Sequence, residues 1–149
     1  MIMNVIKYTS HLLVCLLLVL GMQACSANGP KPIKYGKDQC VYCKMTISDA
    51  RFGTQLLTKK GRAYNFDDVS CMIAFSKEGQ VGPEDIADLY VPDYHTKKLY
   101  PVTALFFLKS EQLKSPMRGD IAAFKNESDL KHMQEKLGGE QLTWEQISK

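Results

Sequence analysis

The fold is decided by residues 54–79, TQLLTKKGRAYNFDDVSCMIAFSKEG, in which two short strand-like runs precede a stretch with helical spacing. The two runs, 54–58 and 62–66, are separated by a lysine and glycine turn, and this pattern is typical of a β-hairpin. Asp67 or Asp68 can cap the helix that follows, because the next apolar residues recur on one helical face. The stretch therefore predicts a hairpin that leads into a helix.

The second half of the chain repeats this order. Residues 103–108 and 120–124 have the pattern of strands, and the helix that follows is capped by Ser128. A closing strand is predicted in each half, at 88–91 and 141–144. The sequence therefore predicts an α+β fold of two similar ββαβ units packed as one compact domain, and a cleft between two such units can draw ligands from both.

The N-terminus has the layout of a secretory signal. Lys7 precedes an apolar run over 12–20 that is too short for a comfortable membrane span. A small residue before Cys25 favours lipoprotein processing, in which residues 1–24 are removed and Cys25 is acylated. An uncleaved anchor with an incidental cysteine is the alternative, and either form places the domain outside the cytoplasmic membrane.

The mature chain of about 120 residues is large enough for one domain with a real core. Residues 25–39 are rich in glycine, proline and lysine, so we expect a lipid-anchored flexible tether. The domain proper then covers 40–149, with units of about 40–93 and 94–149. The net charge of the chain is only +3, with no arginine-rich face, so nucleic acid is not expected as a partner.

The main chemical signal is Cys40-Val41-Tyr42-Cys43-Lys44-Met45. Thiolate and thioether sulfur are soft donors that favour Cu(I), and a disulfide exchanger would have no use for Met45. The spacing alone leaves structural zinc, a redox pair and another metal open. Cys71 is a third thiol of the mature chain or a buried core residue, and an odd number fits metal binding better than a disulfide framework.

The other sulfur and imidazole side chains divide into two groups. Met117 lies in a proline and glycine turn, where it is either a further sulfur donor or an ordinary loop residue. Met72 and Met133 fall on apolar helix faces and are expected in the core. His95 and His132 lie in charged surroundings that favour solvated surface over metal binding.

Several short motifs, taken in order, resemble the NosL family of lipoproteins. They are Cys40-x-x-Cys43-x-Met45, Phe66-Asp67-Asp68 with Cys71-Met72, Leu89-Tyr90-Val91-Pro92-Asp93, and Pro116-Met117 ahead of Ala122-Ala123-Phe124. The family form has glycine before the first methionine and after the later one, where this chain carries Lys44 and Arg118.

The resemblance implies a copper-binding accessory protein rather than an enzyme. It implies a two-unit ββαβ fold that binds one Cu(I) and delivers it to the membrane ABC-type machinery that supplies nitrous oxide reductase, from a lipid-anchored position on the periplasmic side. Expected donors are Met45 and Met117 with Cys40 or Cys43, and Cys71 is a further candidate. An extracytoplasmic thiol oxidoreductase using Cys40 and Cys43, and a zinc-binding interaction module, are the alternatives, although a strand expected over 45–47 speaks against the redox motif.

Overall fold

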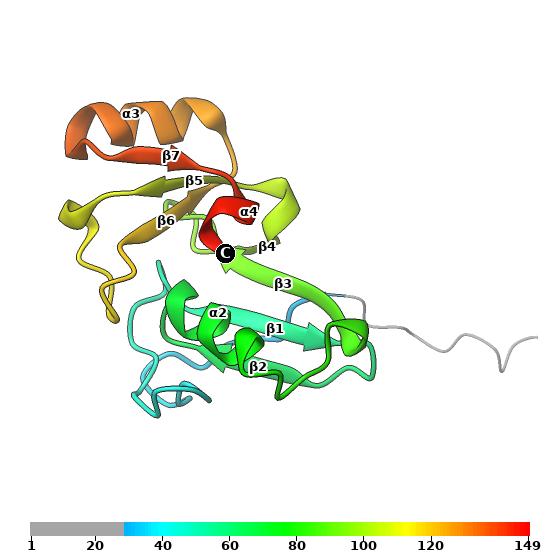
Figure 1. Ribbon diagram of the computed structural model, residues 1–149. Helices are drawn as coiled ribbons and strands as arrows, with labels where there is room; N and C mark the ends of the chain where they lie inside the picture. The colour runs from blue at the N-terminus through cyan, green and yellow to red at the C-terminus, as the bar shows by residue number, and fades with distance from the viewer. Residues whose placement is uncertain (1–28) are drawn as a thin grey trace, which may run out of the picture.

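The computed structural model describes residues 29–149, so the expectations on the signal segment 1–24 and on acylation of Cys25 lie outside the described residues. Two antiparallel sheets lie one above the other in Figure 1. Within the described chain, no helix is long and apolar enough to span a membrane.

The first sheet has four strands in the order β2-β1-β3-β4, with helix α2 packed against its first two strands. Its central strand β1 pairs with both β2 and β3, in each case antiparallel. The elements of this half are β1 (Thr54–Thr58), β2 (Ala63–Phe66), α2 (Val69–Lys77), β3 (Ile86–Pro92) and β4 (Leu99–Pro101), with a 3-10 turn over Pro83–Asp85.

The second sheet has three strands in the order β6-β5-β7, covered by helix α3. The elements of this half are β5 (Phe106–Lys109), β6 (Ile121–Phe124), α3 (Glu127–Leu137), β7 (Glu140–Leu142) and the short α4 (Trp144–Ile147), with 3-10 turns over Val102–Ala104 and Glu111–Leu113. Both halves therefore run ββαβ with the first strand in the middle, which confirms the predicted architecture.

Equivalent residues in the two halves explain why both have the same ββαβ order. Phe66 ends β2 and Phe124 ends β6, and both side chains are fully buried. A polar cap follows each phenylalanine and starts the helix, at Asp68 for α2 and at Asn126 for α3. Burying an aromatic side chain just before a helix start anchors the chain reversal that each unit needs.

The structure has two hydrophobic cores, and the first is shared by both halves. It gathers around α2 and the inner faces of β1 and β2, and includes Phe66 and Met72 together with Phe107 of β5. The second lies under α3 and includes Leu130 and Met133. Both methionines pack in the core as the helical spacing predicts.

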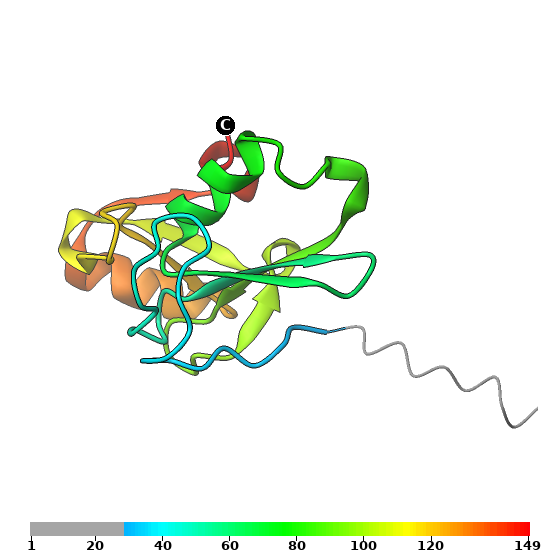
Figure 2. The same ribbon diagram turned by 90° about the horizontal axis from the view of Figure 1, so that it is seen from below.

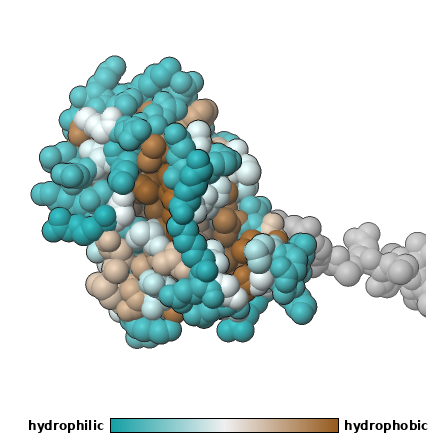
Figure 3. All heavy atoms as spheres, viewed as in Figure 1, coloured by the Kyte–Doolittle hydropathy of each residue, from teal (hydrophilic) through white to brown (hydrophobic). Residues whose placement is uncertain are grey.

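Several contacts join the halves. Asp93, at the end of β3, forms a bridge with Ala123 of β6, and its buried carboxylate accepts a 3.0 Å hydrogen bond from the Lys125 amide. Trp144 of α4 packs on Phe107 of β5, with the ring centroids 5.8 Å apart, and lines a hollow together with Met72 and Leu89 of the first half. Figure 3 shows hydrophobic atoms on either side of this C-terminal segment, between the two halves.

Three local expectations are wrong. Residues 45–47 form only an isolated bridge, between Thr46 and Gln39, rather than a strand. Trp144 begins helix α4 instead of ending a strand, because Thr143 and Gln146 form a capping box there. Helix α3 starts one residue before Ser128, after Asn126.

The stretch before Cys40 is not a flexible tether over its described part. The buried side chain of Gln55 accepts from the Lys31 amide at 2.6 Å and donates to the Lys31 carbonyl at 3.0 Å. Further along, the Gly36 amide donates to the Ile47 carbonyl at 2.9 Å. Residues 31–39 therefore belong to the folded domain.

Candidate metal centre

The Cys40–Met45 segment forms a tight turn that is closed at its base. The Cys40 amide donates to the Met45 carbonyl at 2.8 Å, and the Lys44 amide donates to the Cys40 carbonyl at 3.0 Å. The Cys43 amide points at the Cys40 Sγ, 3.4 Å away. The turn is fixed to β2 by a 3.0 Å bond from the Val41 amide to the Asn65 carbonyl.

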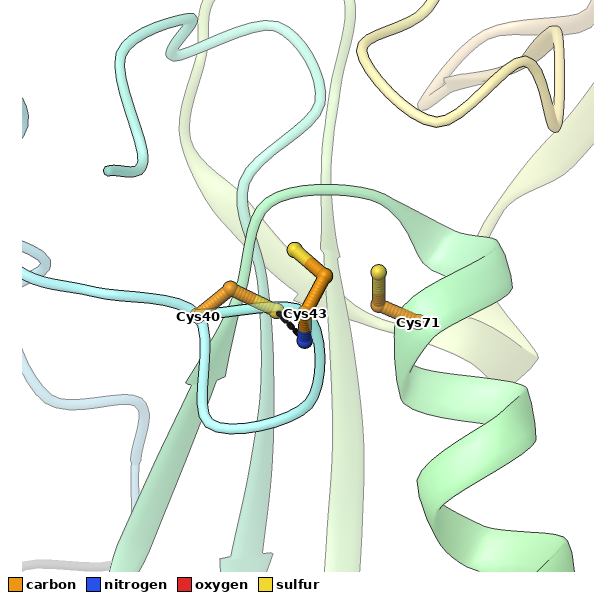
Figure 4. A group of neighbouring side chains, drawn as sticks. All are labelled: Cys40, Cys43 and Cys71. Carbon is orange, nitrogen blue, oxygen red and sulfur yellow. Dashed lines mark hydrogen bonds between the residues drawn. The ribbon is translucent and has the colours of Figure 1, made fainter. Parts of the chain in front are cut away.

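Helix α2 brings the third cysteine to this turn. Asp68 caps the helix by accepting from the Ser70 amide at 2.9 Å, which places Cys71 in the first helical turn. The Sγ atoms of Cys40, Cys43 and Cys71 all lie within 4.8 Å of one another. Figure 4 shows the three side chains converging from the turn and from the start of α2.

The cluster is buried but has one accessible side. Cys40 and Cys71 are buried, and Cys43 is half-buried. No sulfur is in a disulfide among these three cysteines of the described chain. An ion bound between the three sulfurs would therefore be shielded by the fold and reached past Cys43.

The three thiols differ in protonation. The Cys71 thiol donates to the Cys40 sulfur, and the backbone amides of Asp67, Cys43 and Tyr42 also point at it, which lowers the pKa of Cys40 to about 5. The same hydrogen bond and burial raise the pKa of Cys71. Burial raises the pKa of Cys43. At neutral pH the cluster thus holds one thiolate and two thiols.

Two acidic residues lie beside the cluster and have different roles. Asp67 is buried, its Oδ1 has no hydrogen-bond partner within the described chain, and burial followed by the charge of Cys40 raises its pKa. Asp68 is equally buried, but both of its carboxylate oxygens accept hydrogen bonds, because the second oxygen accepts from the Met117 amide at 3.2 Å.

The Asp68 bond brings the turn around Met117 to the cysteine end of the molecule. Gly119 in the same turn lies so close that an added Cβ would be 2.7 Å from Asp68 Oδ1. The Met117 turn comes from the second half of the chain, whereas the cysteines come from the first. Residues of both halves therefore meet at one end of the molecule.

Both methionine candidates stand at the surface. Met45 is 51% exposed and Met117 is 37% exposed, in contrast to the buried Met72. An exposed thioether in a turn is available to a ligand in a way that a core methionine is not. Tyr42, in the cysteine turn, is also exposed.

The two basic residues at the positions where the resemblance implies glycine adopt left-handed backbone conformations. Lys44 has φ of +67° and Arg118 has φ of +57°. Glycine adopts this conformation without strain, whereas another L-residue pays about 1 kcal/mol. The turn geometry is therefore kept despite the substitutions, with a positive charge placed next to each methionine.

His95 and His132 do not join the centre. His95 is exposed and its ring contacts Tyr94 and Phe124, with the centroids 5.8 Å and 5.7 Å away. His132 is exposed on α3. Among residues 29–149, the group of three or more thiol, imidazole or carboxylate donors close enough to hold one ion is the cysteine cluster.

An α+β domain with a buried three-sulfur cluster belongs to the class of proteins that can bind a soft metal ion. The NosL family model matches residues 32–149, and the chain belongs to the NosL family. The crystal structure of the copper chaperone NosL from Shewanella denitrificans matches with a TM-score of 0.66 at 18% identity, over 81% of this chain and 98% of that one. No curated protein matches the sequence.

Sequence reasoning missed the link between the two halves of the site. Asp68 is recognisable as a helix cap, but its bond to Met117 joins residues 49 positions apart and has no local signal. The role of Cys71 was left open between core and ligand, and the structure places its sulfur with the other two.

Proposed function

We propose that this protein binds Cu(I) at the cluster of Cys40, Cys43 and Cys71, with Met45 and Met117 as additional thioether donors. It then delivers the ion to the membrane ABC-type machinery that matures nitrous oxide reductase. The observation that carries the proposal is the approach of three cysteine sulfurs to within 4.8 Å of one another. Membership of the NosL family and the fold shared with a copper chaperone agree with it.

The donor set suits a cargo ion better than a permanent one. Soft thiolate and thioether ligands favour Cu(I), whereas zinc sites normally use four donors in a closed tetrahedron. The three cysteines supply three, and of the described residues neither His95 nor His132 lies with them. A site of low coordination beside exposed Met45 and Met117 leaves a path along which an incoming partner ligand can replace the protein's own donors.

The redox alternative is less well supported by the geometry. A reactive pair normally has its attacking thiolate exposed at a helix N-terminus. Here the low-pKa sulfur, Cys40, lies buried in a turn, and the cysteine in the first turn of α2 is Cys71, whose pKa is raised. The protein is therefore assigned a binding and transfer role rather than turnover of a substrate.

The test is an anaerobic titration of the reduced protein with Cu(I) against a competing chelator, with Zn(II) in parallel. One tightly bound Cu(I) per chain and weak zinc binding support the proposal. Single serine variants at Cys40, Cys43 and Cys71 then identify the thiol donors. Tighter binding of Zn(II) than of Cu(I) would instead support the zinc-binding alternative, and no metal binding at all would support the thiol-disulfide alternative.

The contribution of the thioethers is tested separately. Replacing Met45 and Met117 with leucine keeps the volume but removes the donor atom. Met133→Leu is the matched control, because Met133 packs in the second core. Cu(I) affinity that falls in the double variant and not in the control identifies the methionines as ligands.

We further propose that Cys25 carries a lipid anchor on the periplasmic side of the membrane. The short apolar run and the small residue before Cys25 support this. Mass spectrometry of the mature N-terminus tests it, with Cys25→Ser as the variant expected to lose the anchor. Delivery is tested by transfer of Cu(I) from the loaded protein to the purified ABC-type complex, measured against transfer from free Cu(I).

A further inference from the structure

Three lysines line one shallow hollow at the start of the described chain, and we call this surface the lysine face. They are Lys31, Lys97 and Lys98, and the remaining lining residues are Pro30, Pro32, Ile33, Tyr35 and Leu99. No carboxylate lines the hollow. The ion pairs among residues 29–149 join Arg51 to Asp49 and Lys131 to Glu127, so the three lysines are unpaired there.

The backbone at each of the three lysines is held by hydrogen bonds to a buried residue. Lys31 is clamped through its backbone by both groups of Gln55. The turn that carries Lys97 and Lys98 is closed by Asp93, whose carbonyl accepts from the Lys97 amide at 2.7 Å and whose amide donates to the Lys98 carbonyl at 2.9 Å. Three positive charges are thereby brought together from segments far apart in sequence, on a rigid support.

Local carboxylates do not cancel this charge. Hydrogen bonding from Arg51 lowers the pKa of Asp49, and the nearby charge of Lys97 lowers it further. The Asp49 carboxylate is therefore already bound, by two nitrogen atoms of Arg51. The prolines and Ile33 between the lysines add apolar surface. A rigid basic surface with apolar residues at its centre matches the interface of a bilayer that contains anionic lipids.

The lysine face and the metal centre lie in different parts of the molecule. In both Figure 1 and Figure 2 the described chain begins on the right, away from the loop that carries Cys40 and Cys43, and none of the three cysteines lines the lysine face. Cys25 precedes Pro30 by five residues, which can span no more than about 17 Å. A lipid on Cys25 would therefore hold the lysine face next to the membrane.

We propose that the lysine face docks on anionic lipid headgroups and fixes the orientation of the domain, with the metal centre turned away from the bilayer. The biological role rests on the lipid anchor proposed above, but headgroup binding is a property of the folded domain and needs neither acylation nor copper. Its failure is therefore distinguishable from failure of the copper proposal.

The first experiment is sedimentation of the chain from residue 26, which contains both sheets and both cores, with vesicles. Vesicles of phosphatidylcholine alone are compared with vesicles that also contain phosphatidylglycerol. Each lysine near an anionic surface is worth roughly fivefold in binding, so glutamine at all three positions should weaken binding about a hundredfold. Binding of the unmodified chain should also fall as salt is added.

The control variant removes the same charge elsewhere, with glutamine at Lys59, Lys60 and Lys136, which are exposed and outside the face. Equal loss in both variants would show a net-charge effect and overturn the proposal. Unchanged vesicle binding in the lysine-face variant would also overturn the proposal, and would favour an acidic protein partner for these lysines.

The second experiment uses the full chain with its anchor, reconstituted in the same two kinds of vesicle and treated with trypsin. Docking predicts slower cleavage after Lys97 and Lys98 on anionic vesicles than on neutral ones, and equal cleavage after Lys59 and Lys60. Equal rates at all four positions on both vesicles would contradict a docked orientation.

Discussion

Asp68 is the residue whose removal should affect both the fold and the metal centre. Its carboxylate accepts from the Ser70 amide and hydroxyl, each at 2.9 Å, and from the Met117 amide at 3.2 Å. Loss of a helix cap costs about 1 kcal/mol. Loss of a hydrogen bond to a charged acceptor costs about 1.5 kcal/mol more. Asp68→Ala should therefore lower the free energy of unfolding by about 2.5 kcal/mol in urea denaturation of the reduced protein.

Asp68→Ser separates the two contributions. Serine is a good helix cap but is too short to accept from Met117, so this variant should lose only about 1.5 kcal/mol. It should also bind Cu(I) more weakly, because the Met117 turn is no longer held against α2. If Met117 is a ligand, the double variant with Met117→Leu should bind no more weakly than Met117→Leu alone.

Two outcomes would refute this reasoning. Asp68→Ser that is as stable as the parent would show that the bond to Met117 contributes nothing to stability. The second outcome is that Asp68→Ser loses stability but keeps the Cu(I) affinity of the parent, while Met117→Leu binds Cu(I) more weakly. This result would show that the Asp68 bond does not position the thioether.

The remaining predictions concern protonation and backbone conformation. If all three thiols bind Cu(I) as thiolates, about two protons leave at neutral pH, because only Cys40 is already ionised. The Cu(I) affinity measured by chelator competition should then rise about a hundredfold per pH unit. If Cys40 binds with methionines alone, the affinity should not change with pH. Arg118→Gly should raise the free energy of unfolding by about 0.5–1 kcal/mol in urea denaturation, since it relieves the left-handed conformation, and an unchanged value would mean that the turn relaxes. Gly139→Ala should lower the thermal midpoint of unfolding far more than Gly138→Ala. Both glycines have positive φ, but only at Gly139 would an added Cβ collide with a backbone oxygen, that of Lys109. Equal shifts in the two variants would contradict the steric argument.

The elements were predictable where the signal is local. The strand-like runs over 54–58 and 62–66 and the helical spacing after Asp68 correspond to β1, β2 and α2. The same local pattern recurs after β5 and β6, so the duplicated ββαβ order followed from the sequence. These patterns report which face of each element is buried, and burial is what sets the pairing.

Contacts between distant segments were not predictable from the sequence alone. Gln55 and Lys31 are 24 residues apart, and their two hydrogen bonds fix a glycine- and proline-rich stretch that composition assigns to a tether. Likewise, nothing near Asp68 indicates that it binds the Met117 turn. The donor residues could be proposed from their types and spacing, but not which of them the fold brings together.

The bridge at Asp93 has a consequence for the rate of metal transfer. Because Asp93 joins β3 to Ala123 and also binds the Lys125 amide, the two sheets are fastened to each other at the point where the chain passes between them. Opening the two halves would break this junction and expose the hydrophobic core that they share. In the proposed transfer, release would then depend on the rate at which an acceptor replaces sulfur ligands one by one at the surface. Exchange should accordingly be accelerated by the acceptor's concentration, with no slow opening step to limit it.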